Sequence, residues 1–183
     1  MAQFTIRTGS PPPSDLHLAA SRGDTSQIKK LLEAGVDVNT TGSHGETPLH
    51  SAAANSYSNS IRLLATAHAS IDTRNSDGMT PLHRAAENGH TRAIVALADN
   101  GANIHQSNFQ GNMAIHLAAI NNHGDTVRLL LKLGSDPTVK NKKGYDVYAI
   151  AKACHASAVQ EALHDYDKKN SLWARLKKYF RGE

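Results

Sequence analysis

The sequence GMTPLHRAA, residues 78–86, recurs in modified form at four other places in the 183-residue chain. The related stretches read SDLHLAA (14–20), GETPLHSAA (45–53), GNMAIHLAA (111–119) and GYDVYAIAK (144–152). Two residue types recur at one constant interval, namely His17, His50, His83 and His116, and Gly45, Gly78, Gly111 and Gly144. A fixed period that holds over most of a chain is typical of proteins built from stacked repeats.

Each part of the motif has a physical role in forming a helix. Thr47 and Thr80 lie where a side-chain oxygen can cap a helix, and each is followed by a proline at the first helical position, where an N–H is not needed. A second apolar cluster recurs behind the first, in IKKLLEAGVDVN (28–39), IRLLATAHASID (61–72), IVALADNGANIH (94–105) and VRLLLKLGSDPT (127–138). The sequence therefore predicts pairs of helices that bury their apolar sides against neighbouring pairs.

These motifs resemble the ankyrin repeat family from about Ser14 to Asp167. The resemblance implies an all-α repeat protein, an ankyrin solenoid of stacked helix-turn-helix units with projecting β-turns or hairpins. We expect about five repeats, at residues 14–41, 42–74, 75–107, 108–140 and 141–167. A Pro-rich N-terminal extension, residues 1–13, precedes them, and Ser14 is the expected cap of the first helix. A basic amphipathic C-terminal helix is expected within residues 168–183.

The second repeat departs most from the family pattern among the internal repeats. Ser56 and His68 stand where the family usually has glycine, and Ser60 occupies a normally aliphatic position. We therefore expect this repeat to be the loosest internal one. In the fourth repeat, Met113 and Ala114 replace the Thr-Pro pair, which weakens the start of that helix.

Composition indicates a soluble globular chain with its positive charge at one end. The sequence is 39% hydrophobic and 20% charged, with a net charge of +4. Residues 168–183 hold six basic and one acidic side chain, whereas the preceding part of the chain holds 14 basic and 15 acidic ones. A nucleic-acid partner is therefore not expected for the repeats. The single cysteine, Cys154, and the lack of a secretion signal or a membrane-spanning apolar run favour a cytoplasmic protein.

No known catalytic or metal-binding motif is present, so we expect no enzyme, cofactor or metal site. The four motif histidines do not suit a shared metal ion, because stacked helices lie about 8 to 10 Å apart and two ligands of one zinc lie within roughly 4 Å. We expect each imidazole to bond to the backbone of the neighbouring turn instead. Cys154 and His155 are adjacent on a helix and so point apart, which disfavours a nucleophile–base pair.

The ankyrin resemblance implies a concave partner-binding surface made of hairpin tips and inner-helix ends. Carried onto this chain, these positions are His44, Glu46, Arg74, Asp77, Met79, Glu87, Asn88, Phe109, Gln110, Asn112, Ile120, Asn121, Lys142, Lys143 and Tyr145. Phe109 and Met79 are expected at tips where no core is available to bury them, and aromatic and Met side chains are enriched at interfaces. The alternative is that Phe109 folds back on Ile120 or Met113. We expect Phe109→Ala with Met79→Ala to weaken binding by more than about 1 kcal/mol without unfolding the stack.

The C-terminal segment is a second candidate site. Asn170 or Ser171 can cap a helix from Leu172 to about Arg181, and one apolar stripe runs along that helix. The stripe comprises Leu172, Trp173, Leu176, Tyr179 and Phe180, and Lys177 and Lys178 lie largely off it. We expect the stripe to pack on the open face of the last repeat; the alternative is a membrane surface or a partner groove.

The sequence thus predicts a non-catalytic protein–protein interaction module, an adaptor or an inhibitor, that is monomeric and binds a protein of unknown identity. One alternative is a bacterial effector that acts on a host protein in the host cell cytosol. The other is membrane-surface binding through residues 168–183.

Overall fold

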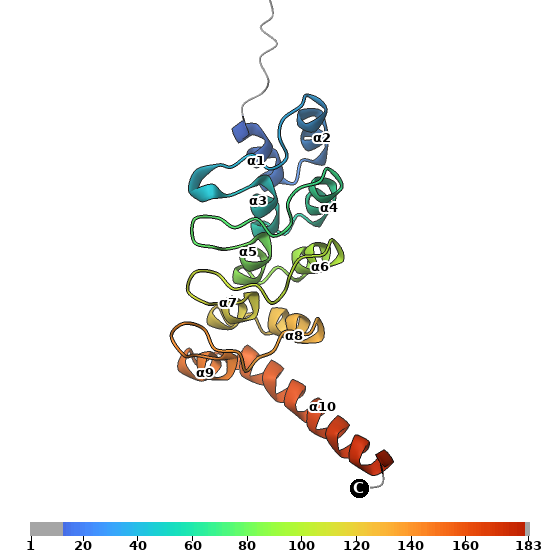
Figure 1. Ribbon diagram of the computed structural model, residues 1–183, viewed down its shortest axis with the longest axis vertical. Helices are drawn as coiled ribbons and strands as arrows, with labels where there is room; N and C mark the ends of the chain where they lie inside the picture. The colour runs from blue at the N-terminus through green and yellow to red at the C-terminus, as the bar shows by residue number, and fades with distance from the viewer. Residues whose placement is uncertain (1–12, 182–183) are drawn as a thin grey trace, which may run out of the picture.

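The computed structural model describes the backbone of residues 13–181 and the side chains of residues 15–171. Over this range the chain forms five helix pairs joined by projecting loops (Figure 1). The pairs are α1 (Pro13–Arg22) and α2 (Thr25–Glu33), α3 (Pro48–Ala54) and α4 (Ser58–Thr66), α5 (Pro81–Glu87) and α6 (Thr91–Asp99), α7 (Ala114–Ile120) and α8 (Gly124–Lys132), and α9 (Val147–Ala153) and α10 (Ser157–Arg181). One short 3-10 helix, η1 (Ser43–Gly45), lies in the first loop.

The pairs stack in two rows, which confirms the predicted repeat architecture. The inner helices α1, α3, α5, α7 and α9 lie beside the loops, and the outer helices form the opposite face (Figure 1). Leu49, Leu82 and Ile115, at equivalent positions of successive inner helices, are each at most 1% exposed. Since each inner helix is only seven residues long in repeats two to five, its stability depends on this packing rather than on its own hydrogen bonds.

The motif histidines form the regular row that the sequence predicts. The Nε2 atoms of His17, His50, His83 and His116 lie 2.8, 3.0, 3.0 and 2.9 Å from the carbonyl oxygens of Glu46, Met79, Asn112 and Val139, respectively. In the three internal repeats the Nδ1 atom accepts a hydrogen bond from the backbone N–H of Thr47, Thr80 or Met113. Because Nδ1 accepts, the proton resides on Nε2 and is donated to the next loop.

The loops are tight turns, and within residues 13–181 the structure has no β-strand, only an isolated bridge between Ser107 and Met113. Successive tips are joined by backbone hydrogen bonds. Ser76 N donates to His44 O at 2.8 Å, Phe109 N to Asp77 O at 3.1 Å and Lys142 N to Gln110 O at 3.1 Å. The tips are therefore held in one row rather than projecting independently.

Two non-glycine residues of the second repeat adopt the backbone conformation that the family usually gives to glycine. Ser56 has φ 62° and His68 has φ 64°. This left-handed region is strained for residues with a Cβ atom. Ser60 in the same repeat is fully buried, and its hydroxyl has no hydrogen-bond partner among the described residues. The expectation that this repeat is the loosest internal one stays a prediction.

The C-terminal helix differs from the sequence-based expectation. α10 runs without interruption from Ser157 to Arg181, so no separate helix begins within residues 168–172. The segment contains no Gly or Pro to end the helix, and the Ser171 hydroxyl donates to Lys168 O within the helix rather than capping a new one. The predicted caps at Asn170 or Ser171 were therefore wrong. At the other end, α1 begins at Pro13, one residue before the expected cap.

The first half of α10 closes the stack. It packs on α8 and α9, and the Asn122 side chain accepts the N–H of Ala158 at 3.1 Å. Arg128 of α8 forms ion pairs with Glu161 and Asp165 of α10. The tail residues from Leu172 to Phe180, and the extension of residues 1–12, lie outside the residues whose side chains the structure describes.

Candidate binding surface

The predicted surface residues follow the row of loops and inner-helix ends, but they differ in exposure. Eleven are exposed: His44, Arg74, Asp77, Asn88, Phe109, Gln110, Ile120, Asn121, Lys142, Lys143 and Tyr145. Glu46, Glu87 and Asn112 are half-buried, and Met79 is buried. The structure therefore divides one predicted surface into parts with different chemistry.

In the N-terminal part, two of the three acidic candidates, Glu46 and Glu87, are already paired within the chain. Arg84 of α5 contacts Glu46 at 2.7 Å and Glu87 at 3.0 Å. The Asn75 side chain donates a further hydrogen bond to Glu46 at 2.6 Å. Burial opposes ionisation of Arg84, but its bonds with both carboxylates outweigh that effect and raise its pKa. The pair of Glu46 with Arg84 consequently joins repeats two and three, and the pair of Glu87 with Arg84 lies within α5, so both carboxylates already have a partner.

Met79 was wrongly predicted to be an exposed tip residue. Its exposed fraction is 6%, its N–H donates to the Asn75 side chain, and its carbonyl accepts the bond from His50. The physical reason is its place directly before the capping Thr80, where the chain has already turned back into the stack. The double substitution with Phe109 is therefore not a clean test of binding, because Met79→Ala also removes core packing.

Phe109 packs against a partner that the sequence analysis did not foresee. A Cβ atom added to Gly78 would lie 2.6 Å from Phe109 Cδ1, so the ring covers the backbone of the preceding loop. This contact is with the neighbouring repeat. The side chain nevertheless remains 55% exposed, which leaves much of the ring available for contact.

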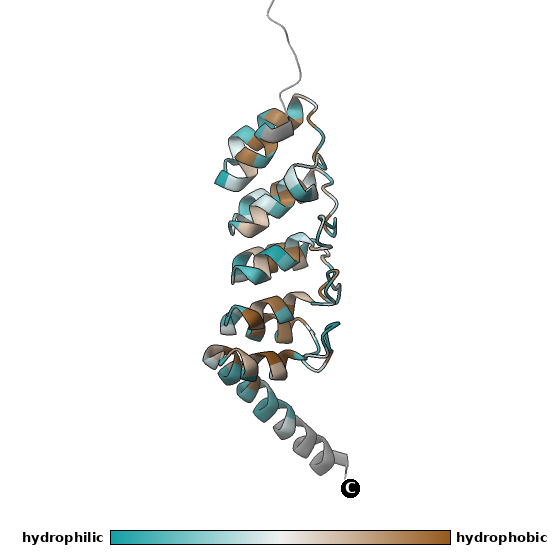
Figure 2. Cartoon of the chain, turned by 90° about the vertical axis from the view of Figure 1, so that its left-hand side faces the viewer, coloured by the Kyte–Doolittle hydropathy of each residue, from teal (hydrophilic) through white to brown (hydrophobic). Residues whose placement is uncertain are grey.

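In the C-terminal part, a hollow of about 290 Å³ opens between the third and fourth loops. It brings together the predicted residues Gln110, Asn112, Ile120, Lys143 and Tyr145 with Asn141, Ile150, Ala153 and Cys154. Ile120 is 42% exposed and Tyr145 is 48% exposed, so the hollow offers apolar surface from both of its sides. Viewed from the loop side, α7 and α9 are predominantly hydrophobic, whereas α3 and α5 are mixed (Figure 2).

The fourth loop, which lines this hollow through Lys143, is basic. Lys140, Lys142 and Lys143 are exposed, and their ammonium groups make no ion pair within the described residues. The floor is ordered, because the Asn141 side chain donates to Asn112 Oδ1 at 2.8 Å and thereby joins the two loops. Asn141 and Ile150 were not predicted from the sequence, although both occupy repeat positions close to predicted residues.

The remaining candidate groups have structural roles. Burial lowers the pKa of His83 to about 4 and also lowers the pKa values of His50 and His116, so these imidazoles are neutral near pH 7. Cys154 is exposed and follows the last residue of α9, and His155 takes a left-handed conformation with φ 51°. Among the side chains of residues 15–171, no cluster of three or more His, Cys, Asp or Glu is arranged to hold a metal. In the described part of the chain, no helix is apolar enough over sufficient length to span a bilayer.

An all-helical stack whose loop side carries a basic, partly apolar hollow defines a repeat-type binding scaffold. Residues 16–108 and 68–141 match the family described as "Ankyrin repeats (3 copies)". The two matches together span residues 16–141, more than half of the sequence, and the chain belongs to the ankyrin repeat family. Ankyrin repeats are generally protein–protein interaction modules. A search of curated proteins found none that matches this chain.

Proposed function

We propose that this protein is a non-catalytic interaction module, an adaptor or inhibitor, whose protein partner docks on the C-terminal half of the loop side. The observation that carries the proposal is the contrast along that side. Toward the N-terminus, Arg84 pairs with Glu46 and Glu87, whereas toward the C-terminus Ile120 and Tyr145 stay exposed around a hollow. Exposed apolar side chains at the centre of a polar rim are typical of binding sites.

The charge of the rim supports a partner with acidic groups beside an apolar anchor. Lys142 and Lys143 have no internal counter-ion in the described part of the chain, so an acidic partner would gain favourable contacts without breaking existing ones. The apolar anchor would enter between Ile120 and Tyr145. Phe109, on the same row of loops, would extend the contact toward the third repeat.

The exposed thiol of Cys154 at the edge of this hollow supports a reducing compartment, and we place the interaction in the cytosol.

Quantitative affinity capture from cell extract, with matched variants, tests this proposal. Ile120→Asp with Tyr145→Ala should reduce captured partner by at least about tenfold, because apolar anchors carry most interface energy. Leu133→Asp is the control: Leu133 is 37% exposed at the end of α8 and does not line the hollow. Equal capture by all three proteins, each with an unchanged melting temperature, would contradict the proposed site.

A further inference from the structure

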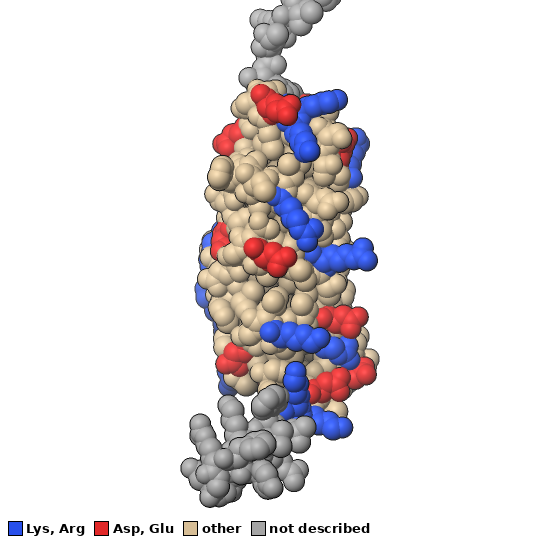
Figure 3. Space-filling model, turned by 90° about the vertical axis from the view of Figure 1, so that its right-hand side faces the viewer, with Lys and Arg blue, Asp and Glu red and all other residues tan. Residues whose placement is uncertain are grey.

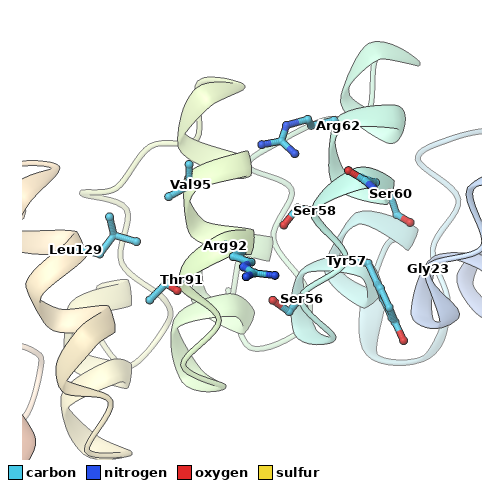
Figure 4. A pocket seen from close by; sticks show the side chains of 11 residues that line it. Gly23, Ser56, Tyr57, Ser58, Ser60, Arg62, Thr91, Arg92, Val95 and Leu129 are labelled. Carbon is cyan, nitrogen blue, oxygen red and sulfur yellow. The ribbon is translucent and has the colours of Figure 1, made fainter.

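A second hollow, of about 610 Å³, lies on the face opposite the loops. It extends over the outer helices α4 and α6, and its lining runs from Gly23 of the first repeat to Leu129 of the fourth (Figure 4). The volume falls within the range of roughly 300 to 1,000 Å³ that is usual for ligand sites. Since the lining comes from four successive repeats, the hollow is elongated along the stack, and such a shape suits an extended chain.

Two arginines of this hollow have no acidic partner. Arg62 extends from α4 toward α6, and Arg92 lies near the start of α4 (Figure 4). Neither guanidinium makes an ion pair or hydrogen bond within the side chains that the structure describes. α4 contains no acidic residue, and the single one of α6, Asp99, is in its last turn.

Arg128, the equivalent of Arg62 two repeats later, does have acidic partners. Arg128 occupies the same repeat position in α8 as Arg62 does in α4, and it contacts Asp125, Glu161 and Asp165. Basic side chains follow the outer face with acidic ones among them (Figure 3). Arg62 and Arg92 are the two cationic residues of this hollow, and both are available to an anionic ligand.

The lining also includes the first turn of α4. Ser58 and Ser60 line the hollow there, but their Oγ atoms are buried without a hydrogen-bond partner among the described residues and are not open to a ligand in the hollow. Ser60 is fully buried, so its unsatisfied hydroxyl is costly in the free protein. Both lie in the first turn of α4, where the helix dipole favours negative charge and Tyr57 provides no side-chain cap.

The other part of the lining is apolar. Val95 is 39% exposed, Tyr57 is 37% exposed with its ring over Gly23, and Leu129 is half-buried. A ligand for this hollow thus combines a strongly anionic group with apolar groups on either side of it.

From these observations we infer that the outer-face hollow is a docking site for an extended peptide segment that carries a phosphorylated side chain. A phosphate group presents about two negative charges and three acceptor oxygens, which matches two guanidinium groups that have no counter-ion among the described side chains. The flanking peptide side chains contact Val95 and Leu129 on one side and Tyr57 on the other. This site is separate from the proposed loop-side surface, and its occupation would allow one chain to hold two partners at once.

The test uses the full chain and two fluorescent peptide libraries with a fixed central residue, phosphoserine in one and serine in the other, at degenerate flanking positions. The protein should retain the phosphoserine library at least about tenfold better, because charge-assisted bonds to a phosphate dianion are strong. Arg62→Gln with Arg92→Gln should remove this preference. The control, Lys29→Gln with Lys30→Gln, removes the same charge from exposed positions of α2 and should leave the preference intact.

Equal retention of the two libraries, or the same loss in the control as in the arginine variant, would overturn the inference. So would displacement of the peptides by equimolar inorganic phosphate, which would show a site for the free anion only. Backbone amide shifts of Ser58 and Thr91 on addition of the selected phosphopeptide would locate it at the hollow. Because Ile120 and Tyr145 are unchanged in these variants, a failure here leaves the proposed loop-side function testable on its own.

Discussion

Acidification should destabilise the stack through the buried histidines. His83 has an ordinary pKa of 6.5 when unfolded, and burial lowers its pKa to about 4 in the folded protein. Between these two values the unfolded chain binds more protons than the folded one, so stability is full above pH 6.5 and falls as the pH drops toward 4. On lowering the pH from 7 to 5, His83 alone should reduce the free energy of unfolding by about 2 kcal/mol.

The other two internal histidines act in the same direction. Burial also lowers the pKa values of His50 and His116, and each makes the same pair of backbone hydrogen bonds. The loss for the whole protein should therefore exceed the contribution of His83. Urea unfolding followed by circular dichroism at the two pH values measures it.

A His83→Gln variant isolates the contribution of one imidazole. It should be less stable than the natural chain at pH 7 by about 1 to 3 kcal/mol, because the N–H of Thr80 and the carbonyl of Asn112 lose a partner. Its further loss between pH 7 and pH 5 should be smaller by about 2 kcal/mol, since the titrating group is gone. If natural and variant proteins lose the same free energy over this interval, His83 is not a buried neutral imidazole and the reasoning fails.

Four further substitutions test packing, each by urea unfolding at pH 7. Met79→Ala should lower the free energy of unfolding by about 2 to 4 kcal/mol, because the side chain is 6% exposed. Phe109→Ala should lower it by under about 1 kcal/mol, because that side chain is 55% exposed, and equal losses would contradict the assigned burial. Gly78→Ala should destabilise by at least about 1 kcal/mol, since φ is 74° and the new Cβ would meet the Phe109 ring, and Phe109→Ala should relieve the steric part of that loss. Ser60→Val should raise stability by up to about 1 kcal/mol, because it replaces an unsatisfied buried hydroxyl beside an open hollow; a loss would indicate a tightly packed site instead.

The sequence predicted those features that repeat, because a fixed period also fixes the side-chain direction at every copy. The row of His17, His50, His83 and His116 follows directly from their constant spacing in the sequence. Met79 was misplaced because one position separates a loop tip from the buried residue before a cap, and spacing alone does not determine which way that side chain turns.

Features that join different repeats were harder to predict. The hydrogen bond of Arg84 with Glu46 joins positions 38 residues apart in the sequence, and the ring of Phe109 covers Gly78 of the preceding repeat. The outer-face hollow was not predicted either, although Ser60 at a normally aliphatic position was a signal for it. Its other residues, Arg62 and Arg92, become noticeable only when the structure shows which charges lack a partner.

The two candidate surfaces differ in how many of their polar groups are already bonded within the chain. This difference affects how each surface would bind a partner. Around the loop-side hollow, Asn141 joins the third and fourth loops, and the Tyr148 hydroxyl donates to Asp167 at 2.6 Å, which ties α9 to α10. Burial and this bond to Asp167 raise the pKa of Tyr148, so the phenol keeps its proton and the tie persists across neutral pH. A partner there meets a surface that is already ordered, and little of its binding energy is needed to fix the protein.

The outer-face hollow has the opposite character. Ser56 is strained, the hydroxyls of Ser58 and Ser60 lack partners, and Arg62 and Arg92 lack counter-ions within the described side chains. A phosphorylated ligand would supply a counter-ion to both arginines and thereby link the second and third repeats. Because a ligand that binds only the folded state raises its stability, the selected phosphopeptide should increase the melting temperature of the natural chain and leave that of the Arg62→Gln/Arg92→Gln variant unchanged. An increase of equal size in both proteins would place the peptide elsewhere on the stack.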